Sequence, residues 1–124
     1  MLKLGPLGLD GSGKPMVYDS KTDHFILGTT DKKMLVLNAK DGSVLASIPV
    51  QGPVDETVID EGPRRVFGAD KAGVVEVIDL DQNKVVATIP SEKNAHTLAV
   101  EPKTHHLFVS LNEGNTVAVF TPSM

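Results

Sequence analysis

The sequence contains no cysteine and no tryptophan, and its aromatic residues are Tyr18 and four phenylalanines. Without cysteine the chain can form neither a disulfide framework nor a thiolate zinc site. So few aromatic rings leave little for stacking on nucleic-acid bases. The net charge is −4 and no run of Lys or Arg exceeds two residues. A nucleic-acid partner is therefore not expected.

Long hydrophobic runs are also missing. No apolar stretch approaches the roughly 18 residues that a membrane-spanning helix needs, so we expect no membrane partner. The first residues, MLKLGPLGL, contain one Lys and an apolar run broken by Gly and Pro. They lack the hydrophobic region of a secretory signal. We expect a cytoplasmic protein, while a signal removed earlier stays an open alternative.

Helical periodicity is absent, because no segment keeps a 3.6-residue apolar period over about 11 residues. Short runs rich in Val, Ile, Leu and Phe alternate instead with turn residues such as Glu61-Gly62-Pro63. In the middle of the chain these runs predict strands at 55–60, 65–69, 73–79 and 84–90. The 124 residues are thus expected to form one all-β domain.

The chain repeats itself at a spacing of 41 residues. Ile48-Pro49 recurs as Ile89-Pro90, and Val17-Tyr18-Asp19 corresponds to Val58-Ile59-Asp60. Four strands in about 40 to 45 residues is the size of a β-propeller blade. The spacing predicts three four-stranded blades within a single domain, residues 1–124. Their approximate bounds are 14–50, 55–90 and 96–120.

Two segments carry a family resemblance: GNTVAVF, from Gly114 to Phe120, and NKVVATIP followed by AHTLAVEPKTHHLFVS. They resemble the YVTN-type β-propeller repeat. The resemblance implies a propeller fold but no single function, because the family includes binding, surface and enzymatic members. The first repeat departs from the pattern, with Asp31-Lys32-Lys33 in place of the loop glycine and the NTV entry.

Three blades are too few for a ring, because propellers close with about 4 to 8. Residues 2–9 have the register of a fourth strand, whereas the last repeat ends after its third strand, 115–120. We therefore predict a head-to-tail homodimer that forms a six-bladed ring by strand exchange. Residues 2–9 of each chain would complete the last blade of the partner. A trimer, or a piece of a larger propeller, remains the alternative.

The candidate site lies at the mouth of the central channel. Lys14, Asp55 and His96 occupy the same repeat position, at the entry to each innermost strand. Glu56 follows Asp55 directly, and Asn94 precedes His96. The loops between second and third strands share this face of a propeller and add candidate substrate contacts. These are Thr30, Asp70 and Asn112.

These residue types suit a metal-assisted hydrolase of esters, lactones or phosphoesters. Imidazole and carboxylate ligands from His96 and Asp55 would hold a divalent metal such as Zn²⁺. The metal would turn bound water into a nucleophile. Lys14 would stabilise the developing oxyanion, and Glu56 would act as a base if the metal is absent or distant.

The alternative function is a non-catalytic scaffold that binds a ligand or a protein. A His in the position of His96 is common in the YVTN-type repeat that this chain resembles, where it would hydrogen-bond neighbouring blades. Asp55 and Lys14 would then form only a solvated rim. Fold alone does not decide between these functions.

Other motifs are incomplete. Residues 8–15, GLDGSGKP, match the glycines and the lysine of a phosphate-binding loop, but Pro15 replaces the Ser or Thr. A strand is predicted after it, not a helix, so we expect neither a nucleotide nor an organic cofactor. His105 and His106 are expected to be an exposed pair in a turn. There is no Gly-x-Ser-x-Gly elbow for a serine nucleophile.

Overall fold

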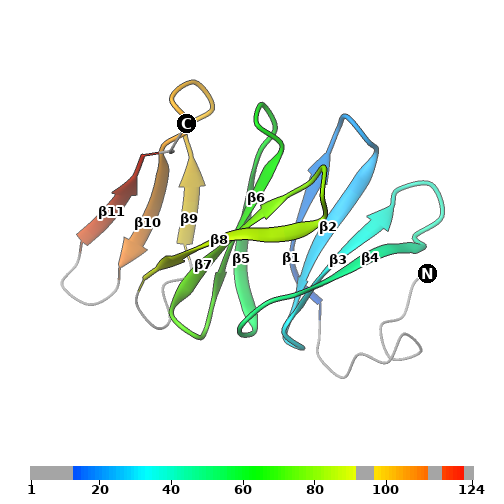
Figure 1. The fold of residues 1–124 in the computed structure, drawn as a ribbon, viewed down its shortest axis with the longest axis horizontal. Coiled ribbons are helices and arrows are strands. Elements are labelled where there is room, and N and C mark those ends of the chain that lie inside the picture. Colours follow the sequence, from blue (N-terminus) through cyan, green and yellow to red (C-terminus); the bar gives the residue numbers. More distant parts are fainter. Residues whose placement is uncertain (1–12, 92–96, 112–115, 122–124) are drawn as a thin grey trace.

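The computed structural model describes residues 13–91, 97–111 and 116–121, which form three antiparallel sheets (Figure 1). Sheet 1 consists of β1 (Gly13–Asp19), β2 (His24–Thr29), β3 (Lys33–Asn38) and β4 (Val44–Pro49). Sheet 2 consists of β5 (Val54–Asp60), β6 (Arg65–Asp70), β7 (Val74–Asp79) and β8 (Lys84–Pro90). Sheet 3 consists of β9 (Thr97–Val100), β10 (Leu107–Leu111) and β11 (Thr116–Phe120). Each sheet is a meander in which consecutive strands pair.

The strands follow the apolar pattern closely. The four strands of sheet 2 begin and end within one residue of the predicted ranges. The repeat also appears in the backbone, because the turns between first and second strands each contain a left-handed residue. These residues are Asp23, Arg64 and His105, with φ angles of 59°, 59° and 62°. No helix occurs in the three described ranges, and thus none there that could cross a membrane.

Sheet 2 lies between the other two sheets, and the first strands β1, β5 and β9 lie side by side (Figure 1). Side chains alternate between the two faces of each strand. In β6, Val66 therefore packs in the cluster between sheets 1 and 2, while Phe67 packs in the cluster between sheets 2 and 3. The first cluster also contains Ile26, Met34, Val36, Ile48, Val54 and Ile78. The second also contains Ala69, Val75, Val77, Leu98, Leu107 and Val109.

Sheets 1 and 2 approach each other closely at Gly28. A Cβ atom on this residue would lie 2.7 Å from Cγ1 of Val54, closer than real Cβ contacts allow. Glycine at this position therefore lets β2 lie directly against β5.

Sheet 3 differs from the other two in register. The 41-residue repeat would pair Leu107 with Val119, whereas Leu107 pairs with Phe120. Four residues separate β10 from β11 and three separate β6 from β7, which accounts for a shift of one. A shift of one residue exchanges the faces of a strand. Phe120 consequently packs toward sheet 2, and Val117 and Val119 point away from it.

The predicted fourth-strand segment, residues 2–9, lies outside the described part of the chain. The strand exchange and the homodimer therefore stay predictions. Within the described residues, sheet 3 has three strands and β11 is its edge.

Candidate functional site

The structure supports the backbone equivalence of Lys14 and Asp55. Both lie where the pairing of the first strand with the second is irregular, between Gly13 and Met16 in β1 and between Val54 and Glu56 in β5. Asp55 and Glu56 are half-buried. The side chain of Lys14 and the residues His96, Asn94 and Asn112 lie outside the described part. The metal-assisted site consequently stays a prediction, and elsewhere in the described ranges no three metal-ligating side chains gather.

Two of the three candidate residues from the loops between second and third strands are described, Thr30 and Asp70, and their environments differ. Asp70 is 1% exposed, and its Oδ1 accepts a hydrogen bond from the Ala72 amide at 2.9 Å. Thr30 is half-buried, and the preceding residue, Thr29, takes the position equivalent to Asp70. Thr29 Oγ1 donates to the Lys33 carbonyl at 2.9 Å, so both residues close their turns.

Glu76 is a buried acid that the sequence analysis missed. It is 2% exposed in β7, on the face of sheet 2 toward sheet 1. Its Oε1 accepts a hydrogen bond from the Gln51 amide at 3.3 Å, and its carboxyl group contacts that of Asp70. The sequence did contain a signal, because the repeat aligns Glu76 with the apolar Leu35.

Asp70 and Glu76 form a close pair of buried carboxyl groups. Burial raises the pKa of both carboxyl groups, and the nearby charge of Asp70 raises that of Glu76 further. Among the described residues, Asp70 Oδ2 has no hydrogen-bond donor unless Glu76 carries a proton and donates it. Two carboxylates this close do not both ionise easily. The environment of the pair therefore favours the protonated form of one of the two carboxyl groups.

Opposite this loop face, side chains connect neighbouring sheets in a repeated arrangement. We call it the inter-sheet clamp: the acid that ends the first strand of one sheet accepts a hydrogen bond from the left-handed turn residue of the next. In the first clamp, Arg64 Nη1 donates to Asp19 Oδ1 at 2.8 Å. The side chains of Arg64 and Asp19 are only 8% and 3% exposed. Burial alone would raise the pKa of Asp19, but hydrogen bonds from Arg64 and Thr22 lower it overall.

The second clamp joins sheets 2 and 3. His105 Nδ1 lies 2.6 Å from Asp60 Oδ2, and the two residues are 45 positions apart, as Asp19 and Arg64 are. The predicted exposed pair of histidines is therefore wrong for His105. β10 begins only at Leu107, so His105 belongs to the left-handed turn, from which its ring reaches the neighbouring sheet.

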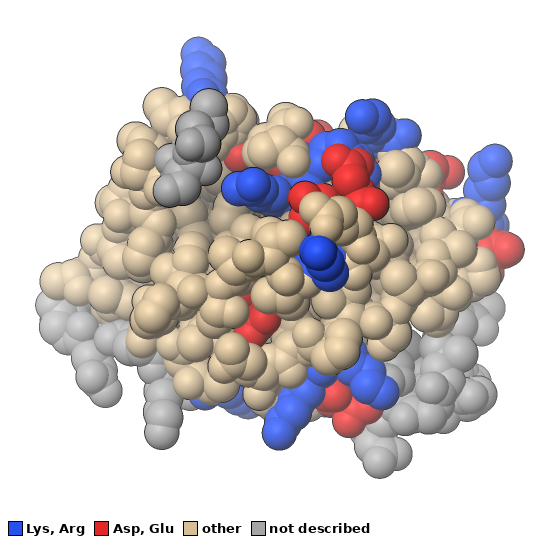
Figure 2. Space-filling view, viewed as in Figure 1, with Lys and Arg blue, Asp and Glu red and all other residues tan. Residues whose placement is uncertain are grey.

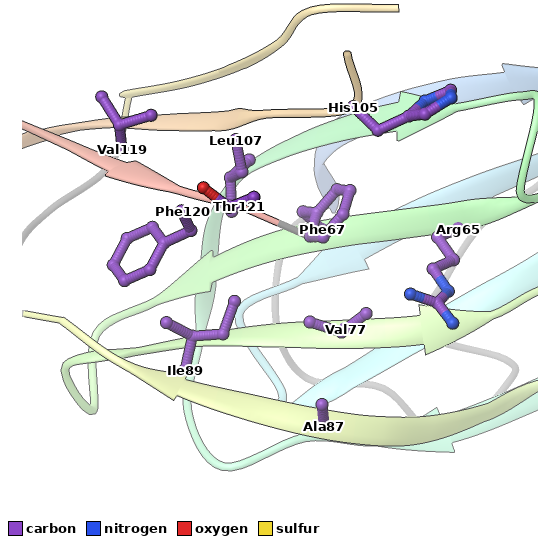
Figure 3. A pocket seen from close by; sticks show the side chains of 10 residues that line it. All are labelled: Arg65, Phe67, Val77, Ala87, Ile89, His105, Leu107, Val119, Phe120 and Thr121. Atoms are coloured by element: carbon purple, nitrogen blue, oxygen red, sulfur yellow. The ribbon is translucent and has the colours of Figure 1, made fainter. Parts of the chain in front are cut away.

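An apolar groove of about 390 Å³ lies between sheets 2 and 3 (Figure 3). Ile89 of β8, which is half-buried, lies on one side, and Phe120 of β11 on the other. Ile48 is the equivalent of Ile89 in sheet 1 and is only 2% exposed. It is buried in a cluster that also contacts Val85, from the fourth strand of sheet 2. The groove thus lies where a fourth strand of sheet 3 would pack. Its lining consists of Arg65, Phe67, Val77, Ala87, Ile89, His105, Leu107, Val119, Phe120 and Thr121.

Charged side chains are unevenly distributed over the face that Figure 2 shows. In Figure 2, Lys, Arg, Asp and Glu gather in the upper central part of the face and along its lower edge, and they are sparser on the left side.

No protein-family model matches the chain, and no curated protein matches it. Solved structures do. A structure of U3-55K matches with a TM-score of 0.74 at 14% identity, covering 93% of this chain and 41% of that one. Hydrazine synthase from Kuenenia stuttgartiensis matches with a TM-score of 0.80 at 10% identity, covering 88% of this chain and 32% of that one. The WD40 repeats of RRP9 match with a TM-score of 0.74 at 14% identity, covering 91% of this chain and 39% of that one.

The three sheets are blades of a β-propeller. At these identities the likeness concerns the fold alone. The propeller fold expected from the sequence is thus confirmed, while the YVTN-type family and the number of blades in the ring are not tested by it. This chain spans between 32% and 41% of the matched structures.

Proposed function

We propose that the chain is a non-catalytic scaffold: a propeller segment that binds a further blade against the outer face of sheet 3. By the outer face we mean the side of sheet 3 turned away from sheet 2, which carries Val117 and Val119. The observation that carries this proposal is the exposure of these two valines, 59% and 51%. When the register shift is taken into account, Val117 and Val119 correspond to Val75 and Val77 in sheet 2. Val75 and Val77 face sheet 3 and are only 0% and 4% exposed.

The outer face therefore carries apolar residues at the positions that are buried between sheets 2 and 3. Because each valine is already about half-buried, completing its burial contributes about 1 kcal/mol to association. Exposed apolar patches of this kind mark interaction surfaces. The groove between Ile89 and Phe120, on the side of sheet 3 that faces sheet 2, would receive the outer strand of the completed sheet.

The solved neighbours include WD40 repeats and also an enzyme, hydrazine synthase, so the fold is compatible with both predicted functions. The scaffold is favoured because its surface is present in the described residues. The hydrolase depends on His96, which lies outside them.

Two measurements test the scaffold. Sedimentation velocity over a range of concentrations compares the wild type with Val119→Lys, and Val86→Lys on β8 serves as an equally apolar, 41% exposed control. We expect concentration-dependent association that Val119→Lys abolishes and Val86→Lys leaves unchanged. An unchanged sedimentation profile for Val119→Lys would count against the proposal.

A second assay addresses the hydrolase. Purified protein with and without added Zn²⁺ is offered ester, lactone and phosphoester substrates. A scaffold gives the rate of buffer alone. Turnover that disappears in both Asp55→Ala and His96→Ala would instead establish the hydrolase.

A further inference from the structure

The acid position of the inter-sheet clamp recurs in sheet 3. Asp19, Asp60 and Glu101 follow one another at the 41-residue spacing, at the end of β1, at the end of β5 and directly after β9. The first accepts from Arg64 at 2.8 Å and the second contacts His105 at 2.6 Å. Glu101 is the third member, and sheet 3 lies at one end of the row of sheets (Figure 1). The donor for Glu101 would come from a blade beyond sheet 3.

Glu101 is arranged as the first clamp acid, Asp19, is. Its Oε2 accepts a hydrogen bond from the Lys103 amide at 2.9 Å, much as Asp19 Oδ1 accepts one from the Lys21 amide at 3.3 Å. The surrounding turn also matches. The His105 amide donates to the Glu101 carbonyl at 2.7 Å, and the Asp23 amide donates to the Asp19 carbonyl at 3.0 Å.

The hydrogen bonds also keep Glu101 charged. Amide donation from Thr104, followed by that from Lys103, lowers the pKa of Glu101 below its usual value. An ionised, oriented carboxylate prefers a cationic donor, and such charge-assisted hydrogen bonds are the stronger kind.

A second copy of this chain brings the wrong charge to this position. The residue equivalent to Arg64 and His105 in sheet 1 is Asp23. Its Oδ1 accepts a hydrogen bond from the Tyr18 hydroxyl at 2.7 Å. Head-to-tail closure by two copies would therefore place Asp23 of one copy against Glu101 of the other, and two such carboxylates repel.

We propose that the outer face of sheet 3 binds a further propeller blade whose first turn carries Arg, Lys or His, with Glu101 as the acceptor of that cation. The apolar part of this surface is formed by Val117 and Val119, and the ionic part is formed by Glu101. The inference depends on the proposed scaffold, because it assumes that the outer face binds a blade. Beyond the scaffold, the inference specifies that the bound blade carries a positive charge, which Glu101 would select.

The test gives this chain the missing donor. Asp23→Arg makes a second copy resemble the proposed partner, so the variant should associate more tightly than the wild type. A charge-assisted hydrogen bond in place of a repulsion gives at least about tenfold per contact, and a closed dimer contains two contacts. We therefore expect about a hundredfold lower dissociation constant by sedimentation equilibrium at neutral pH and low salt.

Two further variants separate the clamp from other effects. Asp23→Asn removes the charge but keeps an acceptor for Tyr18, and it should give only a small part of the gain. Glu101→Gln in the Asp23→Arg background should remove most of the gain. Thermal unfolding of each variant verifies that the fold is intact, and Asp23→Lys replaces Asp23→Arg if the latter is destabilised.

The outcomes distinguish the two proposals. A wild type that is already a tight dimer, with no tightening by Asp23→Arg, would overturn the clamp partner while leaving the scaffold in place. If no variant associates, and Val119→Lys has no effect, both proposals fail. A gain that survives Glu101→Gln would show that Asp23→Arg acts elsewhere.

Discussion

Arg64 and Asp19 meet across the interface of sheets 1 and 2 as a buried ion pair, with Nη1 and Oδ1 2.8 Å apart. The same guanidinium donates through Nε to the more exposed Asp81, also at 2.8 Å. One side chain thus ties the end of β1 to the turn between β7 and β8.

Arg64→Asn should destabilise the fold by about 3 kcal/mol, because it leaves Asp19 buried without its cation. Asparagine is the suitable replacement because it tolerates the left-handed backbone at this position, where φ is 59°. Urea unfolding measures the change. Lys40→Asn, in an exposed turn, is the control. A loss below about 0.5 kcal/mol would mean that the pair contributes no more than an ordinary surface contact.

His105→Asn should cost less than Arg64→Asn, about 1 kcal/mol, because His105 is 34% exposed and water can partly replace it. The matched control is Asp23→Asn, at the same turn position of sheet 1, which keeps an acceptor for the Tyr18 hydroxyl. We expect urea midpoints in the order Asp23→Asn, His105→Asn, Arg64→Asn, from highest to lowest. The reverse order for the two donors would contradict the account of the clamps.

Glu76→Gln should stabilise the protein at neutral pH by about 1 kcal/mol or more. The pKa of Glu76 is raised in the folded state by burial and by Asp70. A raised folded pKa gives stability that is complete below the unfolded pKa and is lost as the pH rises through the folded pKa. Glutamine still donates to Asp70 and accepts from Gln51, but it does not ionise.

The measurement is the urea midpoint as a function of pH. The wild type should lose stability as the pH rises above the ordinary carboxyl range, and Glu76→Gln should lose less. Asp31→Asn, a half-buried acid of the β2–β3 turn, serves as the control and should leave the wild-type profile in place. Parallel curves for wild type and Glu76→Gln would show that the proton is not held at this pair.

Gly28→Ala should destabilise by about 2 kcal/mol, because the new Cβ would lie 2.7 Å from Val54 Cγ1 and the two sheets would have to separate. Gly68→Ala should cost less, since its nearest neighbour is the flexible Met34 thioether, with Sδ at 3.3 Å. Gly62→Ala, in an exposed turn, is the control. Equal losses for all three would indicate an effect of backbone entropy instead of packing.

The sequence predicted the strands and the blade repeat because Val, Ile and turn residues recur at a fixed spacing. The strands of sheet 2 lie within one residue of their predicted bounds for this reason. The faces of β11 were not predictable from the repeat alone. One additional residue between β10 and β11 moves Val119 from the interior face to the outer one.

Two site residues escaped the sequence analysis for different physical reasons. Glu76 is an acid in a strand, and such a residue is expected to face solvent unless its depth in the fold is known. His105 was expected in a turn, where it does lie, but it was expected to be exposed, whereas its ring contacts Asp60 of sheet 2 and its side chain is 34% exposed. Of the predicted channel-mouth residues, Asp55 and Glu56 lie in β5 as expected, and the hydrolase stays a prediction.

The first-turn backbone is almost the same with Asp, Arg or His, with φ between 59° and 62°. The side chain there can therefore change without altering the strands on either side of it. If the clamp selects neighbours as proposed, a single substitution at this turn would decide which neighbour a sheet accepts. Units that fold alike would in this way acquire a fixed order around a ring.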